Sequence, residues 1–279
     1  MTPTLASLAR SGAKQFGRPN EMKIRRAVAR ITPDRSEGDL TGAYHVTPWK
    51  AGSQVIRAVL FDPQVTMYSG LTPDHLEGTH ARIVRIGDRP DRHVSSTGFA
   101  TPDRLTSIDA DWNDGRRRVA AVVREPLSLL GSWYRSNLYT HEPNPDVMRR
   151  REALTSLSET EGLLASIDDE FDLLIDIMVD WSTEAISSDV VRVFRFEDLF
   201  GDEGRGAFAS LLQHLGATLP DPTLERVLRR YGVVGDRTIR VSGTKYEAAG
   251  REKISIDDEV ESRVYSRYGD RLDCLPYDR

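Results

Sequence analysis

Buried strands and amphipathic helices alternate in the hydrophobic pattern of this chain. Residues 119–123 read Val-Ala-Ala-Val-Val without a polar interruption, which is typical of a parallel strand buried on both faces. Residues 43–47 and 190–196 predict two further strands, and an apolar stripe that begins at Val55 predicts a helix directly after the first of them. Strands that alternate with helices at this spacing form crossover connections. The pattern therefore predicts an α/β fold, a three-layer sandwich with a mostly parallel central sheet and helices on both faces.

Helix start and stop signals organise the second half of the chain. Pro126 occupies a good first-turn position for a helix, and residues 158–181 begin with a capping box and continue as one long amphipathic helix. Two later helices are expected to end at Gly216 and Gly232, because glycine is favoured just past a helix end. A last helix is expected to begin at the Ser-Ile-Asp-Asp box of residues 255–258.

The chain divides into a short basic arm and a single domain. Residues 1–35 carry eight Arg or Lys residues against two acidic ones, which predicts a basic N-terminal helical arm. Such an arm is either a targeting or surface-binding segment or a helix docked on the domain. No linker rich in Pro, Gly and Ser divides residues 36–279, so we expect one domain there. Within it, residues 63–114 are weakly patterned, and we expect short strands and loops.

Composition limits the partners of this domain. Of its 279 residues 39% are apolar and 29% charged, and the formal net charge of −5 gives no overall attraction to nucleic acid or anionic membranes. The single cysteine, Cys274, rules out an intrachain disulfide, and no apolar run approaches the roughly 20 residues that a membrane-spanning helix needs. We therefore expect a cytoplasmic protein without a nucleic-acid partner or a membrane span, in which any site for a polyanion is local.

The first candidate site is the loop between the strand of residues 43–47 and the helix that follows it. The sequence Thr-Pro-Trp-Lys-Ala-Gly-Ser-Gln at 47–54 brings backbone N–H groups, a helix N-terminus and the ammonium of Lys50 to one point, which suits a polyanionic ligand. In the ordinary P-loop the lysine follows the second glycine, whereas here Lys50 precedes Gly52, so a standard ATPase or GTPase is not expected. The alternative is a helix-capping turn with an exposed lysine.

Two further segments carry candidate chemistry. Arg124 stands at the end of the strand of residues 119–123, and Ser132 follows two turns into the next helix, so the pair could hold a phosphate. The alternative is a surface arginine and a packing serine. Glu197 and Asp198 come directly after the third strand and could be metal ligands or bases, but such a pair more often caps the next helix or pins a neighbouring loop.

In content and in order, three segments resemble the sulfotransferases that use 3'-phosphoadenosine 5'-phosphosulfate (PAPS) and release adenosine 3',5'-bisphosphate (PAP). The segments are residues 47–54, 122–134 and 194–199. The resemblance implies a P-loop-like loop in which the 5'-phosphosulfate is bound by Lys50, Ala51, Gly52, Ser53 and Gln54. It also implies that Arg124 and Ser132 bind the 3'-phosphate.

The resemblance is weaker elsewhere. The family's C-terminal nucleotide loop is matched only by Arg240 and Gly243, and Val55 stands where the family usually has an aromatic residue that stacks on adenine. Adenine stacking must then come from another residue.

The resemblance also implies a histidine that deprotonates the acceptor between the first two segments, and His93 is the candidate. His141, just after the second segment, is a competing site residue. Tyr134 and Tyr139 are candidates for the wall of the acceptor pocket.

Together these features predict a metal-independent transfer of a sulfuryl group from PAPS to a hydroxyl, or an amine, of a small-molecule or glycan acceptor by in-line displacement. A metal is not required because Lys50 can neutralise the leaving phosphate. A homodimer is also considered. Two alternatives stay open: a small-molecule kinase with a modified P-loop, which would need Mg²⁺, and a binding module that keeps the PAPS or PAP pocket but lacks a base.

Overall fold

The computed structural model describes residues 18–36, 38–79, 82–85, 88–141, 144–235 and 254–277. Its centre is a five-stranded sheet in the order β2-β5-β1-β6-β7, in which every neighbouring pair is parallel. The strands are β1 (Gly42–Thr47), β2 (Thr72–Asp74), β5 (His93–Gly98), β6 (Arg117–Val123) and β7 (Val191–Arg195). A separate antiparallel pair is formed by β3 (Leu76–Thr79) and β4 (Arg82–Arg85).

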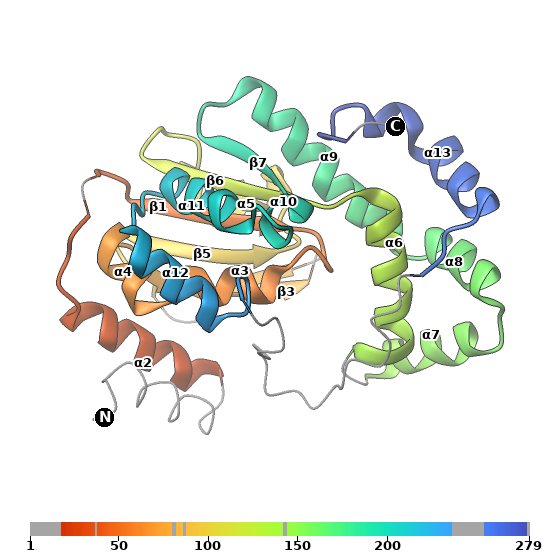
Figure 1. Ribbon diagram of the computed structural model, residues 1–279, viewed down its shortest axis with the longest axis horizontal. Helices are drawn as coiled ribbons and strands as arrows, with labels where there is room; N and C mark the ends of the chain where they lie inside the picture. Colours follow the sequence, from red (N-terminus) through yellow and green to blue (C-terminus); the bar gives the residue numbers. More distant parts are fainter. Residues whose placement is uncertain are drawn as a thin grey trace.

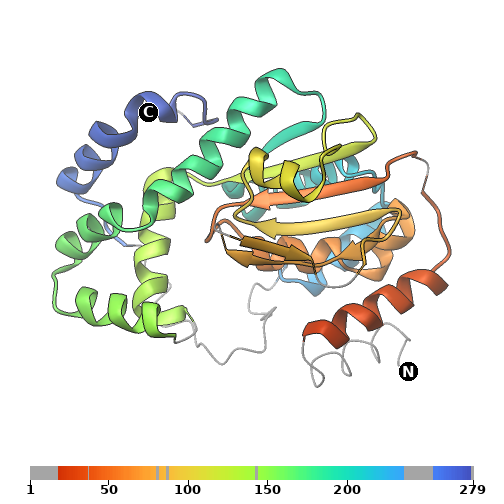
Figure 2. The ribbon, with the colours of Figure 1, turned by 180° about the vertical axis from the view of Figure 1, so that it is seen from behind.

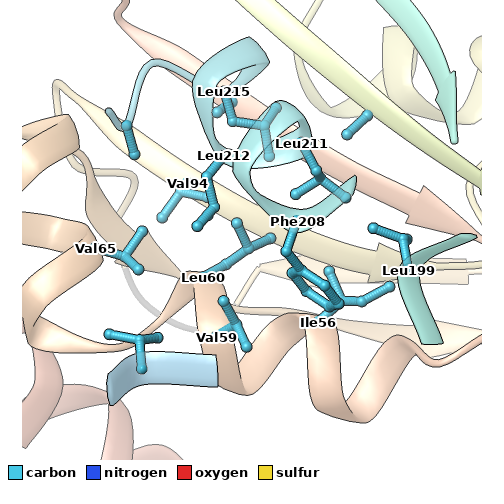
Figure 3. Packing of buried hydrophobic residues seen from close by; sticks show 14 of the residues in the cluster. Ile56, Val59, Leu60, Val65, Val94, Leu199, Phe208, Leu211, Leu212 and Leu215 are labelled. Atoms are coloured by element: carbon cyan, nitrogen blue, oxygen red, sulfur yellow. The ribbon is translucent and has the colours of Figure 1, made fainter. Parts of the chain in front are cut away.

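Helices cover both faces of this sheet (Figure 1), as predicted. One face carries α3 (Ser53–Leu60), α4 (Pro63–Ser69), α11 (Gly204–His214) and α12 (Asp221–Arg230). Figure 3 shows their apolar side chains meeting, with Ile56 and Leu60 of α3 facing Phe208 and Leu212 of α11. All four of these side chains are almost fully buried, so this cluster fixes α3, and with it the loop that precedes α3, against the sheet.

The opposite face, in front in Figure 2, carries α5 (Pro102–Ile108) and α9 (Phe171–Ser187). Their side chains pack on the alternate residues of the central strands: Tyr44 and Val119 face Leu105 and Trp181 in one buried cluster. Because both faces of β1 and β6 are buried, these strands are apolar nearly throughout, which explains why they could be found in the sequence.

A helical lobe lies beyond the carboxyl ends of β6 and β7 (Figure 1). It consists of α6 (Pro126–Arg135), the π-helix η1 (Ser136–Thr140), α7 (Pro145–Thr155), α8 (Glu159–Asp168) and α13 (Asp258–Leu272), with the start of α9. A short helix, α10 (Phe196–Phe200), joins β7 to α11. The lobe has its own buried cluster, so it is a packed extension of the domain and not a loose appendage.

The described part of the N-terminal arm is the helix α2 (Arg18–Ile31), which packs against β2 and α4. Two of its arginines are used inside the molecule: Arg25 donates to the carbonyl of Phe61 at 2.8 Å, and Arg26 donates to the carboxylate of Asp74 at 3.0 Å. This part of the arm is therefore a docked helix, the second of the two readings of the sequence.

Two predictions need correction. Residues 63–114 contain the expected short strands, β2 to β5, but also α4 and α5, whose N-caps Asp62 and Thr101 each precede a proline at the first helical position. The expected long helix of residues 158–181 is two helices, α8 and α9, separated at Asp169 and Glu170. No helix in the described residues is long and apolar enough to cross a membrane.

Candidate functional site

The Lys50 loop is a strained turn between β1 and α3. Gly52, the N-cap of α3, has a left-handed backbone with φ 80°, and Lys50 has φ 69°. Among the described residues, Lys50 and Phe99 alone have a positive φ without being glycine. Both follow the carboxyl ends of adjacent strands, and the N–H of Phe99 donates to the carbonyl of Thr47 at 3.0 Å. Strain of this kind costs about 1 to 3 kcal/mol per residue and clusters at binding sites.

The N-terminus of α3 is suited to an anion. Gly52 provides no side-chain cap, and the first turn of α3 contains no acidic residue. The first N–H groups of a helix and its dipole attract negative charge. Ser53 is partly exposed in the first turn of α3, and Gln54 is exposed and accepts a hydrogen bond from Arg57 at 3.4 Å. Ala51 is fully buried, so only its backbone is available to a ligand.

Arg124 lies beside this loop, as predicted from the strand ends. It follows β6 directly, and its guanidinium donates to the carbonyl of Lys50 at 2.6 Å. The ammonium of Lys50 in turn donates to the hydroxyl of Ser136 at 3.1 Å. Burial lowers the pKa of Lys50, and the neighbouring charge of Arg124 lowers it further. Burial likewise lowers the pKa of Arg124. Two half-buried cations thus meet at one corner of the sheet.

Phe196 and Phe200 of α10 lie beside Arg124 and the Lys50 loop, and we call this pair of rings the aromatic floor. The guanidinium of Arg124 lies over the ring of Phe196, 4.4 Å from its centroid, and the rings of Phe196 and Phe200 are 4.7 Å apart. A Cβ added to Gly52 would lie 2.5 Å from the ring of Phe200 and 3.3 Å from that of Phe196. The left-handed glycine therefore lets the loop approach this aromatic floor closely.

Glu197 holds the backbone on both sides of Arg124. Its carboxylate accepts the N–H of Glu125 at 3.1 Å and the hydroxyl of Tyr277 at 2.7 Å. The hydroxyl of Tyr277 also points to the carbonyl of Val123, 3.1 Å away. The acidic pair was expected to pin a neighbouring loop, and Glu197 does so. No pattern in the sequence pointed to Tyr277, which is 154 residues from Val123.

Ser132 is placed by the helix that begins after Arg124. The side chain of Glu125 caps α6 by accepting the N–H groups of Leu127 and Ser128. Ser132 and Ser136 are four residues apart and so share one face, the face on which Ser136 receives Lys50. Ser132 is partly exposed and lies one turn nearer to Arg124 than Ser136 does.

His93 does not lie at this site. It begins β5 and is opposite Gly42, at the amino end of β1, whereas Lys50 follows the carboxyl end of the same strand. It is 1% exposed, and its Nε2 is 2.8 Å from the hydroxyl of Tyr44. Tyr44 donates to Asp109, which is paired with Arg117. His93 is therefore part of a buried polar network at the other end of β1, and the structure does not bring it together with Lys50.

The remaining candidate site residues differ in their burial and location. Tyr134 is 6% exposed and packs against Gly162 of α8, so it is a core residue and not part of a pocket wall. Tyr139 is 55% exposed. His141 follows η1, is partly exposed, and lies near enough to Lys50 for that charge to lower its pKa. Arg240 and Gly243 lie outside the described residues.

The geometry places one cationic side chain after β1 and a second after β6, at the same edge of a parallel α/β sheet. The sequence matches no protein-family model and no curated protein. Among solved structures, mouse sulfotransferase SULT7A1 complexed with PAP matches 88% of this chain and 87% of its own, with a TM-score of 0.55 and 13% identity. Retinol dehydratase in a complex with retinol and PAP matches 92% of this chain and 87% of its own, with a TM-score of 0.45 and 11% identity.

The first of these matches shows that the chain has the sulfotransferase fold. It confirms the predicted fold class and, at the level of fold, the resemblance noted in the sequence.

Proposed function

We propose that this protein is a sulfotransferase that moves a sulfuryl group from PAPS to a hydroxyl, or an amine, of a small-molecule or glycan acceptor. The observation that carries the proposal is the pairing of Lys50 and Arg124 at adjacent strand ends, joined by the 2.6 Å bond from the guanidinium to the loop carbonyl. Two cationic groups beside one uncapped helix N-terminus suit a ligand that carries separate phosphates.

The residues present fit such a donor. The 5'-phosphosulfate is assigned to the ammonium of Lys50 and to the backbone of residues 51–54, and the 3'-phosphate to Arg124 and Ser132. The Nε of Arg124 is buried and has no hydrogen-bond partner within the described residues, so this side chain retains unused donor capacity. The assignment of Arg240 and Gly243 to the nucleotide rests on the sequence resemblance alone.

The aromatic floor offers a platform for the base. Val55, Phe196 and Phe200 all pack on the margin of the same buried cluster, and the two rings are partly exposed. Phe196 lies under Arg124 and close to Gly52, between the positions assigned to the two phosphates. We propose that this pair of rings, and not Val55, lies beside the base.

Lys50 is placed to assist the departure of the leaving phosphate. Negative charge grows on that oxygen during in-line displacement, and a positioned cation stabilises the charge without a proton transfer. Its side chain is held by the hydroxyl of Ser136, a neutral acceptor that leaves the ammonium charge uncompensated. Loss of such a donor typically costs about 10² to 10³ in rate.

The two alternatives are less well supported. A kinase would need strand-end carboxylates for Mg²⁺, but Glu197 already accepts bonds from Glu125 and Tyr277. A binding module without a base was suggested by the missing histidine, and His93 indeed lies elsewhere. Turnover with any acceptor would exclude the binding module.

Calorimetric titration with PAP, with and without Mg²⁺, tests the proposal. Binding should not depend on Mg²⁺, and Arg124→Ala should weaken PAP binding by about tenfold or more while changing the affinity for adenosine 5'-monophosphate much less. Lys50→Ala should fold normally and lose sulfate transfer. Arg116→Ala and Lys23→Ala, both exposed and remote from the loop, are matched controls. Full turnover by Lys50→Ala, or binding of ATP with Mg²⁺ in preference to PAP, would overturn the proposal.

A further inference from the structure

A π-helical turn places His141 one turn beyond the residue that holds Lys50. The N–H of His141 donates to the carbonyl of Ser136, five residues earlier, at 2.9 Å. The hydroxyl of Ser136 accepts from Lys50 and is 2.9 Å from the hydroxyl of Thr140. Single π-turns are rare and are frequent at functional sites. This turn connects a histidine to the catalytic lysine through a single residue, Ser136.

The proton on the His141 ring is fixed by its neighbours. Its Nδ1 lies 3.1 Å from the side-chain Oδ1 of Asn137. The same Asn137 atom accepts from the guanidinium of Arg150 at 3.3 Å. A guanidinium can only donate, so this Asn137 atom must be the oxygen and Nδ1 of His141 must carry its proton. The second ring nitrogen, Nε2, then holds a free lone pair and can accept a proton.

The ring is also fixed in orientation and reaches the surface. Asn137 is fully buried, whereas His141 is partly exposed. The ring of His141 meets Trp133 edge to face at a centroid distance of 5.3 Å, and Trp133 stacks on Trp49 at 5.4 Å. Trp49 directly precedes Lys50. Two tryptophans therefore connect the histidine to the loop, and Lys50 and His141 are both partly exposed.

The charges around His141 keep its ring neutral. Burial lowers its pKa to about 4, and the charges of Lys50, Arg150 and Arg151 contribute to the shift. Arg150 is itself paired with Asp169 and Glu170, and Arg151 donates to the backbone carbonyls of Asn137 and His141. The charge of Lys50 is the contribution that a bound anion would change.

We propose that His141 is the general base of the reaction and that Asn137 is its positioning residue, an inference that rests on the proposed sulfotransferase function. Nε2 of His141 takes the proton of the acceptor hydroxyl while the acceptor oxygen forms its bond to sulfur. The bond between sulfur and the bridging oxygen breaks, and the electron pair leaves with the 5'-phosphate beside Lys50. The proton then passes from His141 to solvent.

Donor binding should strengthen this base. The phosphate groups offset the charge of Lys50, which lowers the pKa of His141 after the larger effect of burial, so this pKa should rise from about 4 when the site is filled. A base works best when its pKa is near the working pH. His141 would thus be a stronger base when the sulfuryl donor is in place.

NMR of the ring nitrogens in histidine-labelled protein tests the inference without turnover. In the free protein, His141 should appear as the Nδ1–H tautomer with a pKa well below 6.5. Saturating PAP should raise that pKa by about one unit, a tenfold change in the protonation equilibrium. His141→Gln identifies the signal. An Nε2–H tautomer in the free protein, or a pKa unchanged by bound PAP, would overturn the assignment.

Kinetics provide the second readout. His141→Gln should lower kcat by about 10² to 10⁴ and leave PAP affinity unchanged. Asn137→Ala should lower kcat, with a changed pH profile, and Asn137→Asp should restore part of it because it retains an oxygen acceptor. His214→Gln, in which the altered side chain lies at the carbonyl of Val119, is the control. Wild-type turnover by His141→Gln would overturn the base alone, whereas wild-type protein that does not bind PAP would overturn the proposed function and the base with it.

Discussion

Replacing Gly52 by alanine should damage both the fold and the nucleotide site. Gly52 has φ 80°, and a Cβ there would lie 2.5 Å from one ring carbon of Phe200 and 2.8 Å from another. An L-residue in this conformation costs about 1 to 2 kcal/mol, and overpacking against a ring adds about 1 to 3 kcal/mol. The expected loss is therefore about 2 to 5 kcal/mol, a large part of the stability of an ordinary domain.

Urea unfolding measures this loss against a matched glycine. Gly206, in the first turns of α11, has no atom within 4 Å of an added Cβ and no positive φ, so Gly206→Ala should be neutral or stabilising by up to about 1 kcal/mol. PAP titration of the folded Gly52→Ala protein should show weaker binding, because the loop must move away from Phe200 and from Arg124. Gly206→Ala should bind PAP as the wild type does.

A double-mutant cycle separates the two causes of the loss. Adding Phe200→Ala to Gly52→Ala removes the ring that the new methyl group meets but leaves the backbone strain. The cycle should therefore give a compensating interaction of about 1 to 3 kcal/mol. Equal stability of Gly52→Ala and Gly206→Ala would refute the reasoning entirely, and a cycle without interaction would refute the clash with Phe200.

Two other predictions concern the C-terminal tyrosine and acid stability. Tyr277→Phe removes the hydroxyl that donates to the Glu197 carboxylate and lies 3.1 Å from the carbonyl of Val123, and should cost about 1.5 to 3 kcal/mol in urea unfolding. It should also weaken PAP binding more than adenosine 5'-monophosphate binding; equal weakening for both ligands would contradict a role at the 3'-phosphate. Burial lowers the pKa of His45 to about 3 and of His93 to about 4. As the pH falls below 6.5, both histidines therefore take up protons in the unfolded chain before they do so in the folded protein, and the stability should fall between about pH 6.5 and 4. A urea midpoint that is constant over this range would contradict the prediction.

The parts of the fold that follow from single-residue chemistry were predictable. The apolar run of β6 needs burial on both faces, and Pro126 needs a first helical turn, so both appear in the sequence as in the structure. Lys50 and Arg124 could be paired because adjacent parallel strands end at the same edge of a sheet. That reasoning needed no knowledge of how the chain packs elsewhere.

The parts that depend on distant partners were not predictable. β5 lies between β2 and β1 although its sequence, His-Val-Ser-Ser-Thr-Gly, is largely polar. Its polar side chains are satisfied by residues elsewhere in the chain: Ser95 donates to Asp74 at 3.0 Å, and Ser96 is 2.9 Å from Nδ1 of His45. A strand of this kind is stable only once those partners are in place. The positions of His93, away from the site, and of Tyr277, beside it, depend in the same way on partners that are distant in the sequence.

The cationic side chains at the two ends of the sheet have different hydrogen-bond partners, and this difference supports the location of the site. At the amino end, Arg117 is paired with Asp109 at 2.7 Å, and in the edge strand β2 the carboxylate of Asp74 accepts bonds from both Arg26 and Arg85 at 3.0 Å. At the carboxyl end, the bonds that Lys50 and Arg124 make go to neutral oxygens, a hydroxyl and a backbone carbonyl.

A cation that is removed from water costs stability, and the lowered pKa values of Lys50 and Arg124 express that cost, which the charges of Glu197 and Glu125 offset only in part at Arg124. A bound anion would recover it, and an anion with two separated phosphates would recover it at both residues. In a chain with a net charge of −5, this corner with two half-buried cations is where an anionic donor should bind.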